Sequence, residues 1–263
     1  MSDQQPAHAL YEVREQVAWI TLNRPEQRNP LSADMLRGIL AGLETARADD
    51  AVRVAVITGA GDKAFCAGAD LGGFGGEATE VEKHLGRGGF VDMFLAIQRL
   101  GKPVVGCVNG HALAGGFGLA LACDLLVAAE NATFGTPEIN VGLWPMMIMA
   151  LITRNLSRKR AMELMLLGDR IDADTAHAWG LVNRVVPQDE VRATAQALAR
   201  TLTTKSPLIT RLGRDAFFAI DSLGYETALR YLQTQLTLVT LTEDAVEGVT
   251  AFLQKRDPHF KGR

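Results

Sequence analysis

Two glycine-rich segments and one acidic residue decide how this chain is organised: AFCAGADL at residues 64–71, NGHALAGGFG at residues 109–118, and Glu138 in FGTPE at residues 134–138. Each glycine-rich segment follows an apolar run typical of a β-strand and leads toward a helical pattern. Backbone N–H groups at such turns and helix starts lack partners within the helix and point at whatever lies above them. Two of them converging on one carbonyl oxygen make an oxyanion hole, and a nearby carboxylate can move protons on the adjacent carbons.

The composition is that of an ordinary globular protein. The chain has 263 residues, 48% of them hydrophobic and 22% charged, and its formal net charge is -3. This length allows one large domain with an appendage, and the charge gives no reason to expect nucleic acid or an anionic membrane as a partner. Residues 1–9 are polar and lack the apolar core of a signal peptide, and no apolar run approaches the ~20 residues that span a bilayer. We therefore expect a cytoplasmic protein.

The three cysteines, Cys66, Cys107 and Cys123, are odd in number and lie in apolar segments without paired spacing. This pattern predicts buried free thiols in a reducing compartment. The alternative, a nucleophilic Cys66, lacks an activating histidine beside it in the sequence. The five histidines show no ligand-like spacing, so no metal is expected. The GGFG stretch departs from the dinucleotide-binding pattern, so no redox cofactor is expected either.

The hydrophobic pattern predicts an α/β core followed by helices alone. Strands are expected within residues 11–22 (two, around a polar turn), 52–59, 104–108 and 125–128, and helices at 33–47 (with Ser32 as N-cap), 90–100, 115–122, 158–167, 176–180 and 191–204. The glycine-rich residues 72–89 are expected to form a loop that leads into a helix. Residues 209–255 show amphipathic helices without a strand signal. We assign residues 1–200 to the core and residues 201–263 to a helical C-terminal module.

These segments, in this order, resemble the crotonase superfamily, which is the enoyl-CoA hydratase/isomerase family. The resemblance extends from VAWITLNRP at residues 17–25 to FLQKR at residues 252–256. It implies a crotonase-like spiral of ββα units with a helical trimerisation module, and a homotrimer or dimer of trimers. It also implies activity on coenzyme A thioesters, with coenzyme A as part of the substrate and no resident cofactor. In the family's pattern, the N–H groups of Ala69 and Gly115 form the oxyanion hole.

The expected chemistry explains why small residues occupy these positions. Removing a proton beside a thioester places negative charge on the thioester oxygen, and one fixed N–H donor to such an oxygen contributes about 3 kcal/mol or more. Small residues let the substrate carbonyl approach the main chain closely. Asp70 directly follows the first turn, where a structural carboxylate that accepts turn N–H groups is favoured over a catalytic acid.

The chain departs from the family's hydratases at one position. Those relatives use two glutamates, and here Glu138 stands at the second position while Gly118 stands at the first. Two carboxylates can hold a water, activate it and deliver a proton, whereas a single base can move a proton between two carbons. We therefore expect an enoyl-CoA isomerase in which Glu138 is the sole proton shuttle. Two alternatives stay open: an enoyl-CoA hydratase with a non-standard second acid, and a non-catalytic CoA-binding homologue.

Several side chains are candidates for replacing the missing acid or shaping the acyl pocket. The acids are Glu77, Glu80, Glu82 and Glu130, and the histidines are His84 and His111. Their simpler interpretation is a solvated or structural role, although the position of His111 within the second turn keeps it as a secondary candidate. Residues 143–149, LWPMMIM, are bulky where many relatives carry a proline and then a glycine-rich helix start. Trp144 and Met146, with His111, are therefore candidate acyl-pocket residues.

The contacts to coenzyme A are expected from two parts of the chain. Arg24 and Arg28 could pair with phosphates, and the backbone of Ala67 would meet the adenine or pantetheine. Phe252 and Lys255 resemble tail residues that reach coenzyme A bound at a neighbouring subunit. The alternative for all four side chains is that they are surface groups without a ligand.

Overall fold

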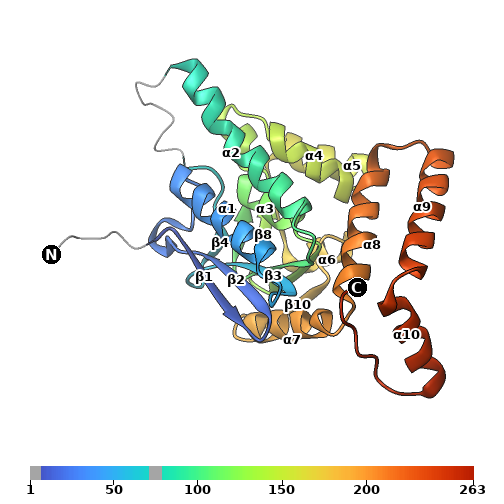
Figure 1. The fold of residues 1–263 in the computed structure, drawn as a ribbon. Helices are drawn as coiled ribbons and strands as arrows, with labels where there is room; N and C mark the ends of the chain where they lie inside the picture. Colours follow the sequence, from blue (N-terminus) through green and yellow to red (C-terminus); the bar gives the residue numbers. More distant parts are fainter. Residues whose placement is uncertain (1–6, 71–78) are drawn as a thin grey trace.

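A computed structural model of the chain describes residues 7–70 and 79–263, and Figure 1 shows its arrangement. Its larger sheet has the strand order β1-β2-β3-β5-β7-β10. The strands are Ala9–Arg14, Val17–Leu22, Val54–Gly59, Val104–Val108, Leu125–Ala129 and Arg184–Val186. β1 pairs antiparallel with β2, and every other neighbouring pair in this sheet is parallel. The strands expected within residues 11–22, 52–59, 104–108 and 125–128 are confirmed as β1, β2, β3, β5 and β7.

Three strands of a smaller sheet lie within or overlap the two glycine-rich segments and the segment that contains Glu138. The strand order of this sheet is β4-β6-β8-β9, with bounds Ala64–Cys66, His111–Leu113, Thr133–Gly135 and Arg170–Asp172. β4, β6 and β8 are parallel neighbours, and β9 is antiparallel to β8. These strands do not show in the hydrophobic pattern of the sequence, because three residues are too few to show the alternation that marks a strand.

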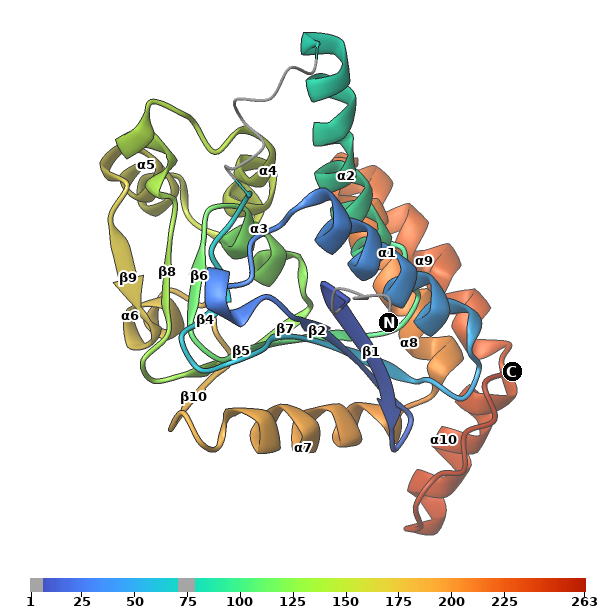
Figure 2. The ribbon, with the colours of Figure 1, turned by 90° about the vertical axis from the view of Figure 1, so that its left-hand side faces the viewer.

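Helices cover both faces of the larger sheet, as Figure 2 shows with α7 on one side and α1 and α3 on the other. The core helices are α1 Ala33–Ala48, α2 Glu80–Gln98, α3 Gly115–Ala122, α4 Met146–Asn155, α5 Arg158–Leu167, α6 Ala173–Ala178 and α7 Val191–Thr203. Short 3-10 helices are η1 Pro25–Gln27 and η3 Pro137–Val141 in the core and η4 Ile220–Ser222 after α8. Alternate strand residues face different layers, since Ala18 and Ile20 pack toward α1 while Val17 and Trp19 pack toward α7. The two hydrophobic layers fix the sheet between the helices.

Local sequence signals explain most helix boundaries, with one expectation corrected. Ser32 caps α1, as predicted, by accepting a hydrogen bond from the N–H of Met35. The expected loop over residues 72–89 is wrong from Glu80 onward, because Thr79 and Glu82 form a capping box that starts α2 ten residues earlier than expected. Glu77, one of the candidate acids, lies outside the described residues.

The C-terminal module consists of α8 Pro207–Ala219, α9 Tyr225–Thr240 and α10 Glu243–Gln254, as the sequence predicts. Arg214 in α8 ties the module to the core through hydrogen bonds to the Asp124 carboxylate and to the carbonyl of Ile97. α9 and α10 stand away from the core (Figure 1), and α9 has no buried residue. The division expected at residue 200 falls inside α7, which packs on the larger sheet.

Within the described residues, no helix is long and apolar enough to cross a membrane.

Candidate active site

The three parallel strands of the smaller sheet bring the candidate catalytic residues to one edge. Ala69 follows β4, Gly115 follows β6 and Glu138 follows β8. Because neighbouring parallel strands run in the same direction, the segments at their carboxyl ends leave the sheet side by side. A hydrogen bond of 2.9 Å from the N–H of Ala114 to the carbonyl of Gly135 joins two of these segments directly.

The backbone nitrogens of Ala69 and Gly115 are close neighbours. A Cβ atom added to Gly115 would lie 3.7 Å from the nitrogen of Ala69, and one added to Gly68 would lie 3.3 Å from the nitrogen of Gly115. Neither N–H group has a hydrogen-bond acceptor among residues 7–70 and 79–263. Gly115 is the first residue of α3, where the helix leaves its N–H groups unpaired and its dipole is positive. The pair therefore has the form of an oxyanion hole.

Unusual backbone geometry holds these two donors in place. Ala114 has φ 51° and ψ −127°, a conformation that a residue with a side chain adopts at a cost of about 1–3 kcal/mol. Gly68 has φ +99°, and a Cβ there would come within 2.7 Å of the Cβ of Ala114. The first turn therefore needs glycine at position 68, and the strain at Ala114 is of the kind that accompanies functional sites.

Glu138 has a buried carboxylate oxygen available for chemistry. It belongs to η3, whose backbone is anchored by Thr136, a buried residue whose hydroxyl donates to the carbonyl of Leu164 over 2.8 Å. The Oε2 atom of Glu138 is buried and has no hydrogen-bond partner in the described part of the chain. Burial raises the pKa of this carboxyl above its ordinary value, and a hydrogen bond from its own backbone N–H opposes the shift only in part. A desolvated carboxylate of this kind is suited to act as a base.

Apolar side chains fill the space beside Gly118. A Cβ atom at this position would lie 2.3 Å from Cγ2 of Ile148 and 3.1 Å from Cζ of Phe94. Ile148 in α4 is buried, so a glutamate at position 118 would require this packing to move. Ile148 and Phe94 thus fill the space that a carboxylate side chain at position 118 would need. The sequence pattern alone did not reveal this packing.

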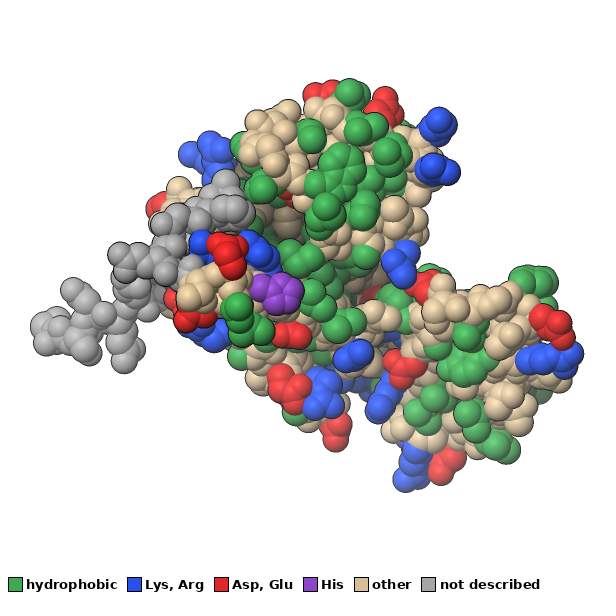
Figure 3. Space-filling model, turned by 90° about the horizontal axis from the view of Figure 1, so that it is seen from above, with side chains coloured by type: hydrophobic (Ala, Val, Ile, Leu, Met, Phe, Trp, Pro, Cys, Tyr) green, Lys and Arg blue, Asp and Glu red, His purple; other side chains and the backbone are tan. Residues whose placement is uncertain are grey.

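The surroundings of the two N–H donors are apolar as well. The Cβ position of Gly115 lies 3.2 Å from a ring carbon of Phe90 and 3.3 Å from Cδ1 of Leu31. Figure 3 shows hydrophobic side chains gathered on the face that carries α2, α4 and α5. Exposed members of this group include Val81, Leu85, Val141, Leu143, Met146, Met147, Leu166 and Leu167. This face offers an apolar acyl chain a matching surface.

The candidate acyl-pocket residues occupy three different environments. Trp144 is partly buried and packs against the main core, whereas Met146, the first residue of α4, is 66% exposed. His111 begins β6 and so lies at the opposite end of the strand from Gly115. Its Nδ1 is 2.9 Å from the hydroxyl of Thr133, and burial together with nearby arginines lowers its pKa. The structure therefore does not bring His111 together with Glu138.

The residues expected to contact coenzyme A are also dispersed. Arg24 donates to the Asp70 carboxylate over 2.9 Å, so Asp70 forms an ion pair at the first turn. The hydrogen bonds expected from turn N–H groups to this carboxylate stay a prediction. The backbone N–H of Ala67 donates to the carbonyl of Arg28 over 3.0 Å. The side chain of Arg28 lines a cavity of about 440 Å³ that also contains His111.

Phe252 and Lys255 lie at the end of α10, far from the core in Figures 1 and 2. Phe252 is 81% exposed, and Lys255 ends the helix in a left-handed conformation with φ 55°. Within one chain, these residues are not near the proposed oxyanion hole. Their expected role requires a second subunit.

The remaining candidate acids have structural partners or solvent around them. Glu82 caps the start of α2 and Glu80 pairs with Lys83, and these contacts lower the pKa of both carboxyls. Glu130 is exposed, and His84 lies on an exposed face of α2. None of these groups has the buried, unpartnered character of Glu138.

The cysteines are free and buried, as predicted. Burial raises the pKa of the Cys66 thiol to about 12 and that of Cys107 to about 11, which opposes formation of the thiolate that a nucleophile requires. Among the described residues, no three His, Cys, Asp or Glu side chains are grouped so that they could hold a metal ion.

Comparison with known proteins gives a consistent result. The family model of enoyl-CoA hydratase/isomerase matches residues 12–263. The chain is 39% identical to the carnitinyl-CoA dehydratase of Salmonella heidelberg over 250 residues, which cover 93% of this chain and 94% of that protein. The crystal structure of an enoyl-CoA hydratase from Mycobacterium smegmatis superposes with a TM-score of 0.92 at 35% identity, covering 96% of this chain and 98% of the other.

An enoyl-CoA hydratase from Bacillus anthracis gives the same TM-score of 0.92 at 33% identity, covering 97% of this chain and all of the other. These matches extend across both the sheet-containing core and the C-terminal helices. They agree with the crotonase-like fold expected from the glycine-rich segments. The chain belongs to the enoyl-CoA hydratase/isomerase family, whose members act on acyl-CoA thioesters.

Proposed function

We propose that this protein isomerises enoyl-CoA thioesters, moving a double bond from the 3,4 to the 2,3 position, with Glu138 as the only proton shuttle. The observation that carries the proposal is the contrast between two positions. Glu138 presents a buried oxygen that has no hydrogen-bond partner among the described residues, whereas the position of the second carboxylate is a glycine packed against Ile148 and Phe94. One base in apolar surroundings suits a proton transfer that needs no water.

The reaction would begin with the thioester oxygen accepting hydrogen bonds from the N–H groups of Ala69 and Gly115. The carboxylate of Glu138 removes a proton from C2, and the electron pair of the C–H bond delocalises into the carbonyl to form a dienolate. The two N–H donors stabilise the negative charge on oxygen. Protonated Glu138 then delivers the same proton to C4, and the double bond forms between C2 and C3. The proton removed from C2 is returned at C4 and the electron pair stays within the substrate, so the reaction needs no further reactant.

The second candidate is hydration of a 2-enoyl-CoA. Relatives named enoyl-CoA hydratase and carnitinyl-CoA dehydratase support it, but it would require Glu138 to hold and activate the water alone. A third candidate is a non-catalytic CoA-binding homologue, but such a protein has no need of a buried carboxylate at the same sheet edge as two N–H donors that have no acceptor in the described part of the chain.

We also propose that the C-terminal module joins copies of this chain into a homotrimer or a dimer of trimers. α8, α9 and α10 expose large apolar side chains, among them Phe217, Tyr225, Leu236, Leu241 and Phe252. Such a set is expected to be buried against another protein surface. Assembly would also give Phe252 and Lys255 a route to coenzyme A held by a neighbouring subunit.

Glu138→Gln is expected to abolish isomerisation, because glutamine keeps the shape of the side chain but cannot accept the proton. We would offer 3-enoyl-CoA and 2-enoyl-CoA separately to the wild type and to the variant, with coenzyme A binding measured as a control for folding. Conversion of the 3-enoyl substrate alone, lost in the variant, supports the proposal. Efficient hydration of the 2-enoyl substrate by the wild type would contradict it.

The pH dependence of isomerisation should follow the raised pKa of Glu138. The base must be ionised, so kcat/KM is expected to fall as the pH drops through this pKa, which lies above the pKa of an exposed glutamate. A value of kcat/KM that stays constant down to about pH 4, where exposed glutamates titrate, would contradict the assignment of Glu138 as the base.

The raised pKa of Glu138 also affects stability. Because the protonated form is favoured in the folded state, the free energy of unfolding decreases as the pH rises through the pKa of Glu138 in the folded state. Glu138→Gln should therefore not lower Tm at neutral pH.

Gly118→Glu is expected to unfold or destabilise the protein, because its Cβ would lie 2.3 Å from Ile148; overpacking of this kind costs about 1–3 kcal/mol or more. Combining it with Ile148→Ala makes room for the carboxylate, and Ile148→Ala alone is the matched control, with an expected cost of about 2–5 kcal/mol. Urea denaturation and the two-substrate assay would be applied to all three variants. A Gly118→Glu single variant as stable as the wild type would show that Ile148 does not block this position.

A further inference from the structure

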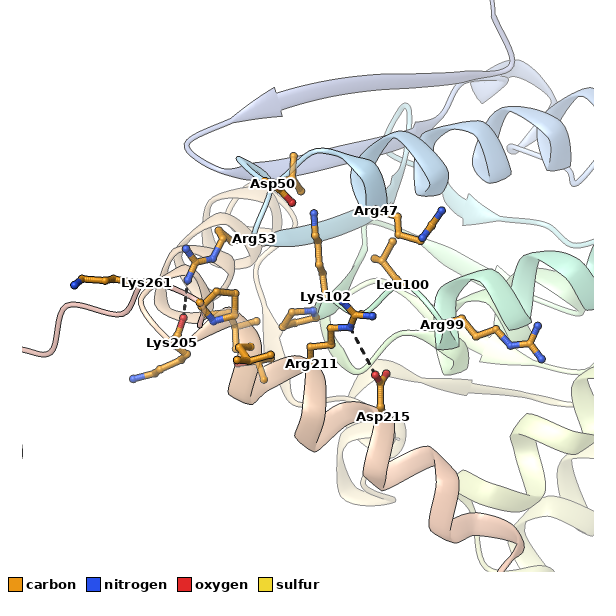
Figure 4. Close-up of a pocket in the computed structure, with 18 residues that line it drawn as sticks. Arg47, Asp50, Arg53, Arg99, Leu100, Lys102, Lys205, Arg211, Asp215 and Lys261 are labelled. Carbon is orange, nitrogen blue, oxygen red and sulfur yellow. Dashed lines mark hydrogen bonds and ion pairs between the residues drawn. The ribbon is translucent and has the colours of Figure 1, made fainter. Parts of the chain in front are cut away.

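A second cavity, of about 490 Å³, lies between the core and the C-terminal module. Its walls come from the end of α1, the segments that lead into β3 and β5, the first turns of α8, and the chain near Lys261 (Figure 4). None of its lining residues belongs to the segments that follow β4, β6 and β8. It is therefore separate from the proposed active site, and its volume falls in the range of roughly 300–1,000 Å³ that ligand sites occupy.

The cavity is strongly basic although the whole chain is slightly acidic, with a net charge of -3. Seven of its lining residues are lysine or arginine and two are aspartate: Arg47, Arg53, Arg99, Lys102, Lys205, Arg211 and Lys261, against Asp50 and Asp215. A concave surface lined by charges of one sign concentrates the field and attracts ions of the opposite sign. Arg47 pairs with Glu44, which is not a lining residue, and Arg211 forms an ion pair with Asp215. The surplus of positive charge that remains favours a ligand with more than one negative charge.

Two cations in this cavity are positioned by carbonyl groups, which orient them without neutralising their charge. Arg53 donates to the carbonyl of Lys205 over 2.9 Å, and Lys102 donates to the carbonyls of Ala46 and Asp49 over 2.6 and 2.7 Å. Both side chains are half-buried. Burial lowers the pKa of Lys102, and the charges of Asp49 and Asp50 only partly oppose this, so an added anion would be favoured beside it.

Arg211 and the start of α8 add to the positive potential. The Nε atom of Arg211 lies 3.8 Å from the Asp215 carboxylate, which is longer than a hydrogen bond, and Figure 4 shows its side chain reaching across the cavity beside Lys102. α8 has 13 residues and begins at Pro207 on the cavity wall. The N-terminus of this helix contributes partial positive charge to the cavity. Its N–H groups at Ile209 and Thr210 already donate to the hydroxyl and the carbonyl of Ser206.

The lining of the cavity also contains apolar residues, here called the apolar floor. Pro103, Leu202 and Leu208 are partly exposed, and Val52 and Leu100 are buried. Basic and apolar residues in one cavity match a molecule that joins phosphate groups to a flat, less polar body. Inorganic ions would use the basic residues alone.

We propose that this cavity binds a phosphate ester of the nucleoside diphosphate type, with its phosphates on Arg53, Lys102 and Arg211 and its base on the apolar floor. The site is distinct from the place where the acyl-CoA substrate is bound, and a nucleotide held there would bind without displacing coenzyme A. The proposal does not depend on whether the protein is an isomerase or a hydratase.

ADP binding to the full-length protein, measured by titration calorimetry, tests this proposal. Arg53→Gln and Arg211→Gln are each expected to weaken ADP binding about tenfold, since each removes a charged donor to phosphate. Arg37→Gln is the matched control, because it removes the same charge from the exposed face of α1, where Arg37 pairs with Asp34. The control should leave the Kd for ADP unchanged.

Three results would overturn the proposal that ADP binds in this cavity, and a fourth would overturn the role of its apolar floor. The first is no binding of ADP at about millimolar concentration, and the second is an equal loss in the Arg37→Gln control. The third is competition between ADP and coenzyme A, which would place ADP in the active site. Pyrophosphate is titrated in parallel, and binding as tight as that of ADP would overturn the role given to the apolar floor. Isomerase activity is assayed separately, so failure of either proposal is recognised by itself.

Discussion

The parallel pairing of β4, β6 and β8 is the constraint on which the rest of the structure depends. Each strand has only three residues, yet their common direction places Ala69, Gly115 and Glu138 at one edge of the smaller sheet. The hydrogen bond from Ala114 to Gly135 and the contact between Gly68 and Ala114 tie the three segments to one another. This pairing brings together residues that are almost seventy positions apart in the sequence. The two hydrogen-bond donors are backbone N–H groups, so their positions do not depend on a mobile side chain.

The apolar surroundings of these residues would also favour the proposed proton transfer, because they keep water away from the reacting groups. Phe90 and Leu31 lie next to the Cβ position of Gly115, so a hydrogen bond from Gly115 to a developing oxyanion would form beside apolar groups. The carboxyl of Glu138 is desolvated, which makes its carboxylate a stronger base than an exposed glutamate. Packing of Ile148 against Gly118 leaves no space for a second acid. Strained backbone at Ala114 is the conformational cost of this arrangement.

Much of this arrangement could be predicted from the sequence, because the deciding residues act locally. The cap at Ser32, the strands of the larger sheet and the start of α3 follow from local patterns, and the family pattern indicated the donors. The sequence could not show the three-residue strands, which lack a readable period, or the capping box that extends α2 back to Glu80. Adjacency within the second turn also does not reveal that β6 separates His111 from Gly115, and the role expected for His111 in the acyl pocket stays a prediction. The filling of the space beside Gly118 depends on α4, which is distant in sequence.

Exchange of the C2 protons of a saturated acyl-CoA with deuterated water tests most directly the claim that Glu138 and the two N–H donors act on a thioester enolate. A saturated substrate can be neither isomerised nor hydrated, so exchange reports proton removal alone. Mass spectrometry of the recovered thioester should show deuterium at C2 with the wild type and none above the uncatalysed level with Glu138→Gln. Equal exchange by the wild type and the variant, or none by either, would contradict the account.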